Sequence, residues 1–306
     1  MRNQEYWELE YLNNRYMKHL SEQELQERTI DIIDNITTLT EKGHLGLHCS
    51  EENGHYWLIL WTHLLKEFNL RYGPYPNGFT NGFIKNADIV KPTYPSPPNS
   101  KVAIDSIGGV ERNQLYKFGR YEYLSKMFKN GIMRISPASS YNDPSLNKAI
   151  RDDELSFDIK RVFNNVVVLN SKRKITPTFG VVQFSLKSNT NYYVHCFSSG
   201  YNFREYDDFE ADACIVIKEP RQFIKCLFKH AKKHLPNYDY FASPVKYLDP
   251  LNCEPNDVDL FYCKHFKYSY QNEFRAIWIP KNPTFKLEPI FIETGSMEKY
   301  AKLIRI

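Results

Sequence analysis

Residues 115–136 read LYKFGRYEYLSKMFKNGIMRIS and contain the strand–helix–strand unit on which the fold prediction depends. The pattern predicts a strand over residues 115–118, a helix over 121–130 and a second strand over 132–136. Leu124, Met127 and Phe128 recur at the spacing of one helix face. Gly131 follows directly, where a glycine ends a helix in the left-handed conformation. This stretch therefore predicts a mixed core of helices and strands that begins near residue 111.

Downstream of this unit, short apolar runs separated by turn residues predict further strands. We expect a turn at residues 140–144, SYNDP, because Asn, Asp and Pro all favour turns. The remaining predicted elements are helices over 151–164 and 223–235 and strands over 181–184, 192–197, 213–217, 244–248, 274–279 and 289–292. Strands interleaved with a few helices at irregular spacing indicate the α+β class.

The first hundred residues have a different pattern, which is helical. Leu25, Ile32 and Ile36 belong to one apolar stripe, and Ser21 is a plausible helix cap before it. Trp57, Trp61 and Phe68 form a second stripe, which is typical of a helix packed in a core. From residue 73 to 109 the chain is rich in Pro and Gly, which excludes long helices. We therefore predict a helical N-terminal domain with a Pro/Gly-rich linker over residues 1–110 and a second domain over 111–306.

Composition indicates a water-soluble protein. Of the 306 residues, 42% are hydrophobic and 15% aromatic, which is too rich in aromatic residues for a disordered chain. No apolar run reaches the roughly 18 residues of a transmembrane helix, and the N-terminus lacks the apolar core of a signal peptide. The expected location is cytoplasmic, without membrane contact, and the six cysteines are expected to be reduced.

Charge is unevenly distributed between the two parts. Residues 1–100 contain 9 Lys or Arg and 13 Asp or Glu, a net charge of −4, whereas residues 101–306 contain 31 and 23, a net charge of +8. A basic part of this kind is able to bind a polyanion such as nucleic acid, or the phosphates of a cofactor. The alternative is an ordinary solvated surface of mixed sign.

Several common signatures are absent. The sequence has no P-loop, no G-x-G-x-x-G, no G-x-S-x-G and no H-E-x-x-H, which argues against P-loop enzymes, Rossmann dehydrogenases, α/β hydrolases and zincins. A group of possible zinc ligands fits no closed zinc module, so we predict no metal site; it comprises His44, His48, Cys49 and His55.

The stretch YQNEFRAIW at residues 270–278 is the most informative for function. Glu273 stands at the mouth of a predicted strand, and Gln271 lies two residues earlier, so both side chains would face one way on an extended chain. Many ADP-ribosyltransferases present their catalytic carboxylate in this way. A carboxylate beside the ribose orients the 2′-hydroxyl and stabilises the oxocarbenium-like charge that develops when the nicotinamide bond breaks. The alternative is a solvent-facing Glu273 that pairs with Arg275 or a lysine.

The order of the short motifs extends this resemblance over residues 113–306. The motifs are LYKF at residues 115–118, the SPASS stretch that leads into YNDP at residues 141–144, CFS at 196–198 and EFR at 273–275. The chain resembles the ADP-ribosyltransferases, and within them a bacterial family of unknown function often found in defence contexts, distantly similar to the DarT and RNA 2′-phosphotransferase branch. In that branch the first strand carries a histidine where this chain has Lys117.

The resemblance implies an ADP-ribosyltransferase-like split β-sheet core and NAD as a substrate. It implies that Glu273 is catalytic and that Gln271 positions the acceptor nucleophile. The residues implied in binding the dinucleotide are Lys117, Ser198, Tyr141, Asn142 and Asp143. A lysine donates hydrogen bonds to hydroxyls and phosphates but does not replace a neutral imidazole. A purely structural role is the alternative for each residue. Lys117 would be a strand lysine that buries its aliphatic stem and keeps its charged end in water, Ser198 a turn serine and Tyr141 a packed side chain. Asn142 and Asp143 would form a turn that binds its own backbone.

The function implied is that of an NAD-dependent toxin or antiphage defence effector, as in toxin–antitoxin systems. The basic, aromatic-rich second domain favours nucleic acid as the acceptor, RNA more than DNA, with a protein acceptor left open. An antitoxin or inhibitor protein could dock on the acidic N-terminal domain. Two alternatives remain: a non-catalytic module that binds a nucleotide or nucleic acid, and an NAD glycohydrolase in which water is the acceptor.

Overall fold

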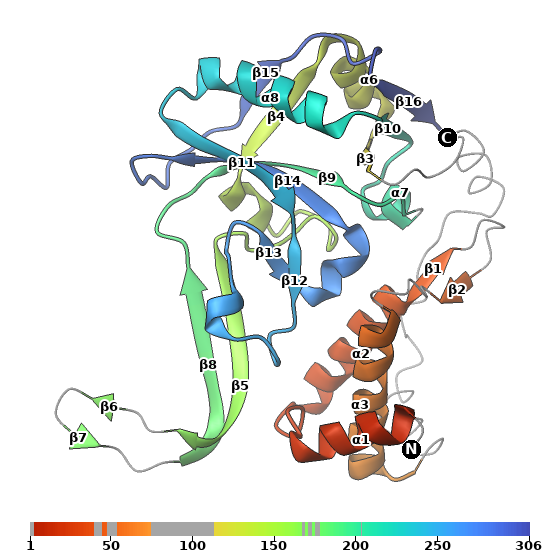
Figure 1. Ribbon diagram of the computed structural model, residues 1–306, viewed down its shortest axis with the longest axis vertical. Coiled ribbons are helices and arrows are strands. Elements are labelled where there is room, and N and C mark those ends of the chain that lie inside the picture. Colours follow the sequence, from red (N-terminus) through yellow and green to blue (C-terminus); the bar gives the residue numbers. More distant parts are fainter. Residues whose placement is uncertain are drawn as a thin grey trace.

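Three parts of the molecule are visible in the computed structural model: a helical N-terminal unit, an antiparallel sheet covered by helices, and a long hairpin that extends from the sheet beside the helical unit (Figure 1). The structure describes residues 3–39, 45–47, 54–74, 113–166, 169–170, 173–174, 178–202 and 204–306. Helices and antiparallel strands are mixed along the chain, so the predicted α+β class is confirmed.

In its described residues, the helical unit contains three helices and a short strand pair. Ser21 caps the second helix, since its side chain accepts a hydrogen bond from the Glu24 N–H while the Glu24 carboxylate accepts one from the Ser21 N–H. The third helix ends at Gly73, which has a φ of 98°. The elements are α1 (Asn3–Asn13), α2 (Glu22–Ile36), β1 (Thr37–Leu39), β2 (Leu45–Leu47) and α3 (Gly54–Tyr72).

The predicted aromatic stripe packs this unit. Trp57 and Phe68 are buried between the helices together with Leu25, and Trp61 packs against them. The Trp57 ring also stacks on Phe266, with 5.8 Å between the ring centroids. The core of the helical unit therefore includes a residue from the C-terminal third of the chain.

The main sheet is antiparallel and brings distant segments together. Its strands follow the order β11-β14-β9-β3-β10-β16, and β4 joins it by pairing with β9 and with β15. Because β14 and β3 both lie beside β9, segments that are far apart in the sequence become neighbours. The strands are β3 (Leu115–Gly119), β4 (Ile132–Pro137), β9 (Tyr193–Ser198), β10 (Ala213–Ile217), β11 (Tyr238–Pro244), β14 (Glu273–Pro280), β15 (Ile290–Glu293) and β16 (Ala301–Arg305).

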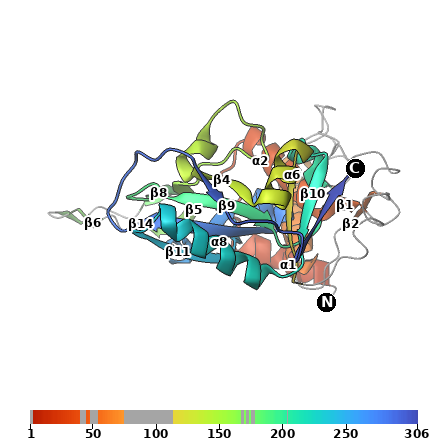
Figure 2. The same ribbon diagram turned by 90° about the horizontal axis from the view of Figure 1, so that it is seen from above.

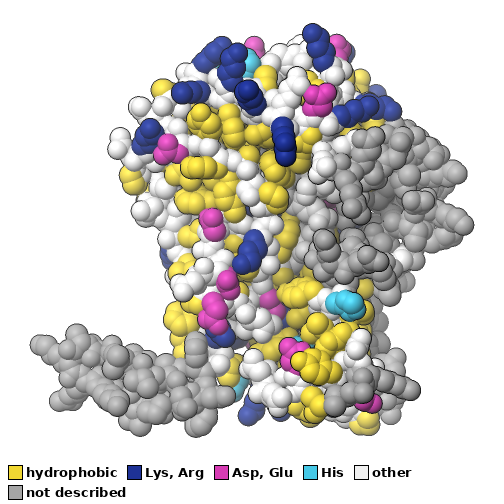
Figure 3. Space-filling view, in the orientation of Figure 1, with side chains coloured by type: hydrophobic (Ala, Val, Ile, Leu, Met, Phe, Trp, Pro, Cys, Tyr) yellow, Lys and Arg dark blue, Asp and Glu magenta, His cyan; other side chains and the backbone are white. Residues whose placement is uncertain are grey.

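Two amphipathic helices cover the sheet, α6 (Tyr121–Asn130) and α8 (Pro220–His234). Their apolar faces, which include Leu124 and Phe223, pack with Trp278 and other strand residues in one core. The outer face of α8 is rich in exposed lysines, which contribute to the dark-blue atoms along the top of Figure 3. The predicted helices over residues 121–130 and 223–235 are thus confirmed.

Gly131 ends α6 as the sequence predicts, with a φ of 68°. The position excludes a side chain for a second reason. A Cβ atom there would lie 2.3 Å from the carbonyl oxygen of Gly295. The Gly131 carbonyl also accepts a hydrogen bond from the Thr294 N–H, at 3.1 Å. This glycine therefore allows the segment after β15 to approach the end of α6.

The helix predicted over residues 151–164 is wrong, because this segment is largely a strand. β5 (Ser156–Val166) pairs with β8 (Thr178–Lys187) in the long hairpin, which also carries β6 (Leu169–Asn170) and β7 (Arg173–Lys174). Phe157 and Ile159 are buried whereas Asp158 between them is exposed, which is the period of a strand and not of a helix. Seen from above, the hairpin and the C-terminus lie at opposite ends of the molecule (Figure 2).

The remaining elements connect the sheet to the helical unit. β12 (Lys246–Leu248) and β13 (Cys263–His265) form a parallel pair, and the 3-10 helix η3 (Phe266–Gln271) leads from β13 into β14. The predicted strand over 244–248 is thus divided between β11 and β12. Short helical turns complete the fold: η1 (Ala138–Asn142), α7 (Arg204–Asp208) and η2 (Pro255–Asp257).

A buried ion pair joins the helical unit to this connecting region. The Arg28 guanidinium of α2 donates two hydrogen bonds to the Asp249 carboxylate, at 3.0 and 2.6 Å. Both residues are buried, and the guanidinium carbon lies 4.9 Å from the centre of the Phe266 ring. Breaking a pair of this kind leaves an uncompensated buried charge, so the pair fixes the position of α2.

Within the described residues, no helix is both long enough and apolar enough to cross a lipid bilayer. The described residues do not include most of the predicted linker or the predicted domain boundary near residue 110. They also do not include three of the four zinc-ligand candidates: His44, His48 and Cys49.

We predict that Arg28→Met lowers the free energy of unfolding by about 3–5 kcal/mol, because it leaves the Asp249 carboxylate buried without its partner. Chemical denaturation measures this loss. The control is Arg120→Met, which breaks the exposed Arg120–Glu210 pair and should cost less than about 1 kcal/mol. Equal losses in the two variants would contradict the role assigned to the Arg28–Asp249 pair.

Candidate functional site

The candidate site lies where β14, β9 and β3 run side by side. Glu273, the first residue of β14, is the cross-strand partner of Ser198, the last residue of β9. Ser198 is in turn the partner of Tyr116 in β3, next to Lys117. The sheet register therefore brings together three of the residues that the sequence singles out.

A cavity of about 220 Å³ opens at this place. Glu273, Gln271, Lys117 and Tyr141 all line it, so four of the seven predicted site residues share one cavity. Three phenylalanines are among the remaining lining residues. The other lining residues are Phe118, Ala149, Ile150, Glu154, Cys196, Phe197, Glu205, Phe209 and Lys264.

Glu273 belongs to a buried cluster of four charged side chains. One of its oxygens accepts a hydrogen bond from the Arg275 Nε at 2.6 Å, and the other accepts one from the Lys264 Nζ at 2.9 Å. Glu154 completes the cluster, with its carboxylate 2.6 Å from an Arg275 Nη and 3.8 Å from the Lys264 Nζ. All four residues are at most 7% exposed. The alternative of a solvent-facing Glu273 is therefore wrong, although the pairing with Arg275 and a lysine is present.

The two carboxyl groups of the cluster titrate differently. Burial alone would raise the pKa of Glu273, but the charges of Arg275 and Lys264 outweigh it and hold the pKa well below the ordinary value of 4.5. Burial dominates at Glu154 and raises its pKa to about 7. Glu273 is therefore ionised at neutral pH, whereas Glu154 is able to exchange a proton there.

Gln271 lines the cavity in a way that differs from the sequence expectation. It ends the 3-10 helix η3, and Asn272 after it adopts a left-handed φ of 44°, so Gln271 and Glu273 do not lie on one extended strand. They meet nevertheless, because the Gln271 side-chain oxygen accepts a hydrogen bond from the same Lys264 Nζ, at 3.2 Å. The Gln271 amide donates to the Ala149 carbonyl at 2.9 Å.

The other predicted residues are divided between the cavity and the surface. The Lys117 Nζ donates to the Cys196 carbonyl at 2.8 Å. Ser198 is buried and donates to the Glu205 carboxylate, which itself lines the cavity. Tyr141 reaches the cavity, but Asn142 and Asp143 are exposed and do not line it. The Asp143 carboxylate binds the Ser145 N–H at 2.8 Å, which is the local turn function that the sequence left open.

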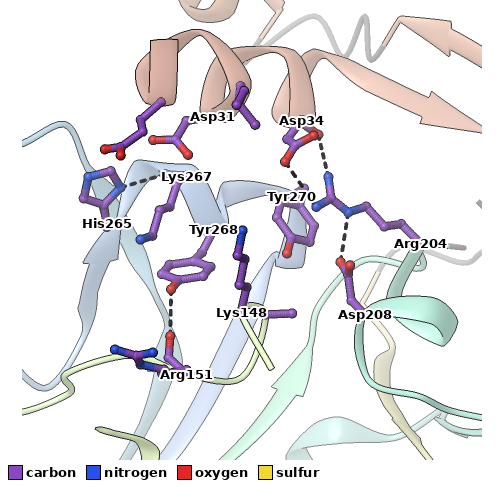
Figure 4. Close-up of a pocket in the computed structure, with 13 residues that line it drawn as sticks. Asp31, Asp34, Lys148, Arg151, Arg204, Asp208, His265, Lys267, Tyr268 and Tyr270 are labelled. Carbon is purple, nitrogen blue, oxygen red and sulfur yellow. Dashed lines mark hydrogen bonds and ion pairs between the residues drawn. The ribbon is translucent and has the colours of Figure 1, made fainter. Parts of the chain in front are cut away.

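Figure 4 shows a larger cleft, of about 670 Å³. It adjoins the cavity, because Ala149 lines both. One wall is α2, which contributes the acidic residues Glu27, Asp31 and Asp34. The other walls contribute basic and aromatic side chains: Lys148, Arg151, Arg204, Lys267, Tyr268 and Tyr270. Burial raises the pKa of Asp31 to about 6, so its charge also changes near neutral pH.

Arg204 ties the walls of this cleft together. Its guanidinium binds Asp34 of α2 and Asp208 of α7, the latter at 2.9 Å, and lies 3.9 Å from the centre of the Tyr270 ring (Figure 4). Lys148 is exposed and projects into the cleft from the segment before β5 (Figure 4). The cleft thus combines a fixed acidic wall with accessible positive charge.

The sequence does not single out three buried residues that line the cavity, Glu154, Glu205 and Lys264. Nor does it assign a site role to Arg275, which pairs with Glu154 and Glu273. One signal was available. Glu273 and Arg275 are two residues apart on a predicted strand, so their side chains share a face, and a buried acid requires such a partner. Nothing in the sequence near Glu205 or Glu154 distinguishes them from surface carboxylates.

No metal site is formed by the described residues, since they contain no group of three or more His, Cys, Asp or Glu that could hold an ion. His55, the one described member of the predicted group, is exposed.

Comparisons of this chain with protein-family models, curated proteins and solved structures found no match. A functional assignment therefore depends on the geometry of the cavity and the cleft, together with the order of the sequence motifs.

We predict that Glu154→Gln changes the pH dependence of stability. The folded protein holds the Glu154 proton more tightly than the unfolded chain does, because burial raises the pKa from 4.5 to about 7. The stabilisation by this proton is complete below the unfolded pKa and is lost as the pH rises through the folded pKa. The melting temperature of Glu154→Gln relative to wild type should therefore rise between about pH 5 and about pH 8.

The control is Glu122→Gln on the exposed side of α6, whose melting temperature should follow wild type at every pH. A difference between Glu154→Gln and wild type that stays constant with pH would show that Glu154 does not exchange a proton in this range.

Proposed function

We propose that the protein is an NAD-dependent ADP-ribosyltransferase with an ADP-ribosyltransferase-like core, and that RNA is its preferred acceptor. One observation carries the proposal: Glu273, Gln271, Lys117 and Tyr141 belong to three separate segments of the chain, carry the sequence motifs, and line one cavity. Packing of the fold alone does not require that residues from separate sequence motifs line the same cavity.

The dimensions of the cavity fit the nicotinamide end of NAD. Small-molecule sites usually measure about 300–1,000 Å³, so a cavity of about 220 Å³ has room for one ring-sized group and not for a dinucleotide. Phe118, Phe197 and Phe209 supply apolar walls for a flat ring. The remainder of NAD would extend into the adjoining cleft, where Lys148, Arg151 and Lys267 are available to its phosphates.

The ionised Glu273 has the charge that the reaction needs. The bond between the nicotinamide nitrogen and C1′ of the ribose breaks, and its electron pair leaves with nicotinamide. Positive charge develops on the ribose, and a buried carboxylate beside it stabilises that charge. The acceptor oxygen or nitrogen then bonds to C1′ and loses its proton, so NAD and the acceptor give the ADP-ribosylated acceptor, nicotinamide and H⁺. Water in place of the acceptor gives NAD hydrolysis.

Gln271 lies where an acceptor would enter. It lines the cavity and binds Ala149, which lies between the cavity and the cleft. The cleft combines basic side chains with Tyr268 and Tyr270, and such a combination suits the phosphates and bases of single-stranded RNA. A toxin or antiphage effector that modifies RNA would arrest growth when expressed, which gives a simple cellular readout.

The acidic residues of α2 offer a binding surface for the proposed antitoxin. Glu27, Asp31 and Asp34 of this helix line the cleft. An inhibitor that uses these acids would therefore bind over the cleft and cover the site.

A second candidate function is a non-catalytic nucleotide-binding module. Its support is that both oxygens of Glu273 already accept hydrogen bonds from Arg275 and Lys264, which reduces the negative charge that Glu273 offers to a ligand. The two functions differ in whether nicotinamide is released.

We predict that Glu273→Gln lowers the rate of nicotinamide release from NAD by about 10²–10³, or 3–4 kcal/mol in the barrier, because an amide cannot stabilise the developing positive charge. It should also lower stability, since Arg275 and Lys264 lose a buried counter-charge. Rates are measured with NAD labelled in the nicotinamide ring, at a temperature where melting curves show the variant folded.

The matched variant is Glu154→Gln, which removes a carboxylate from the same cluster and the same cavity. If Glu273 acts in catalysis, Glu154→Gln should lose much less activity, measured at a temperature where melting curves show both variants folded. Equal losses of activity would mean that Glu273 acts only through the fold. Tight NAD binding without nicotinamide release by wild type would favour the binding module.

We predict that the double variant Lys148→Glu with Arg151→Glu raises the KM for NAD at least about tenfold, with a smaller effect on kcat, because charge-assisted phosphate contacts contribute about 1.5–3 kcal/mol each. Steady-state NAD cleavage measures both constants. The control is Lys225→Glu with Lys229→Glu on the outer face of α8, which should leave KM unchanged. An unchanged KM in the cleft variant would remove the cleft from the NAD site.

A further inference from the structure

One carboxyl group of the cavity has no part in the proposed chemistry. Glu205 of α7 is fully buried and lines the cavity beside Lys117 and Phe209. Its Oε2 accepts a hydrogen bond from the Ser198 hydroxyl, whereas its Oε1 has no hydrogen-bond partner among the residues that the structure describes. A buried polar atom without a partner is costly, so a ligand that supplies one gains free energy here.

Glu205 differs from Glu273 in its electrostatic surroundings. No lysine or arginine forms an ion pair with it among the described residues, whereas Glu273 has two such partners. Burial raises the pKa of Glu205 well above its ordinary value, and the hydrogen bond from Ser198 and the charge of Lys117 do not overcome this effect. Burial therefore favours the protonated form of Glu205, which has one O–H donor as well as acceptor oxygens.

The surroundings of Glu205 suit a flat ligand. Phe118, Phe197 and Phe209 line the same cavity, which is ring-sized. Lys117, which lines the same cavity, donates a hydrogen bond to the Cys196 carbonyl, and its Nζ lies 5.8 Å from the centre of the Phe197 ring. Aromatic walls with a donor and an acceptor at one end are the features that recognise the edge of a polar ring.

We propose that the Glu205 carboxyl group, held by Ser198, binds an uncharged amide carried by a planar ring and discriminates against the corresponding carboxylate. The inference rests on the proposed function for the identity of that ring, which is then the nicotinamide of NAD with its carboxamide. A carboxylic acid and an amide are complementary, because the acid O–H donates to the amide oxygen while the amide N–H donates to an acid oxygen.

Discrimination against a carboxylate follows from the same geometry. An anionic ligand would bring a second negative charge into a buried space that already holds the ionised Glu273. It would also accept hydrogen bonds only, and would leave the oxygen of Glu205 without a donor. The same amide chemistry occurs in the ring edges of uracil and guanine, so a nucleobase of the acceptor is the other possible source.

The experiment measures binding of small probes by calorimetry to the full chain. The probes are nicotinamide, nicotinic acid, uridine and guanosine, and the proteins are wild type, Glu205→Gln, Glu205→Leu and the surface control Glu298→Leu. Wild type should bind nicotinamide at least about tenfold more tightly than nicotinic acid. Glu205→Gln keeps a donor and an acceptor and should stay within about threefold of wild type, whereas Glu205→Leu should lose about tenfold to a hundredfold.

The outcomes separate this inference from the proposed function. The role of Glu205 is overturned if wild type binds nicotinic acid as tightly as nicotinamide, or if a folded Glu205→Leu variant binds nicotinamide with unchanged affinity. In either case, cleavage of NAD by wild type would still support the proposed transferase. Binding of uridine or guanosine through Glu205 without nicotinamide binding supports the amide site and overturns its assignment to NAD. No binding of any probe overturns the inference. The wild-type comparison of the two pyridines is valid even if Glu205→Leu does not fold.

Discussion

The buried cluster of Glu154, Lys264, Glu273 and Arg275 is the constraint on which the site depends. Each of these side chains is at most 7% exposed, and a single unpaired charge in such a place would cost several kcal/mol. The cluster is therefore stable only when the segment before β5, strand β13 and strand β14 are all in place. Because two cations hold the Glu273 carboxylate, it stays ionised in a space that would otherwise favour its neutral form. The same cations limit the charge that Glu273 presents, which is why transfer and simple binding both need to be tested.

The helical unit is part of the site and not an appendage to it. Asn35 of α2 accepts a hydrogen bond from the Tyr270 N–H at 2.8 Å and donates one to the Lys267 carbonyl at 2.9 Å, so α2 holds the η3 segment that leads into Glu273. Arg204 connects α2 to α7, which carries Glu205. The buried Arg28–Asp249 pair fixes α2 itself. Both ends of the cavity are therefore positioned by contacts that cross from the N-terminal residues to the second half of the chain.

Much of the fold could be predicted because local signals agreed with the tertiary structure. The helix over 121–130 with Gly131 after it, the capped α2 and the strand over 213–217 all have the periodicity and end residues that their structure requires. The helix predicted over 151–164 is wrong, because buried and exposed side chains alternate at Phe157, Asp158 and Ile159, which is the period of a strand. Glu273, Gln271, Lys117 and Tyr141 were found from motifs, whereas Glu154, Glu205 and Lys264 were not, because their importance comes from burial and from partners distant in the sequence. Asn142 and Asp143 resemble site residues locally but lie outside the cavity.

Under the proposed function, this cavity breaks the bond between nicotinamide and ribose. The most direct measurement is incubation of the purified chain with NAD that carries one label in the nicotinamide ring and another in the adenosine, with total cellular RNA present. We expect free nicotinamide to appear and an equal amount of the adenosine label to become attached to RNA. Free ADP-ribose in place of labelled RNA would make the protein a hydrolase. NAD recovered intact, with both labels in one molecule, would contradict the account.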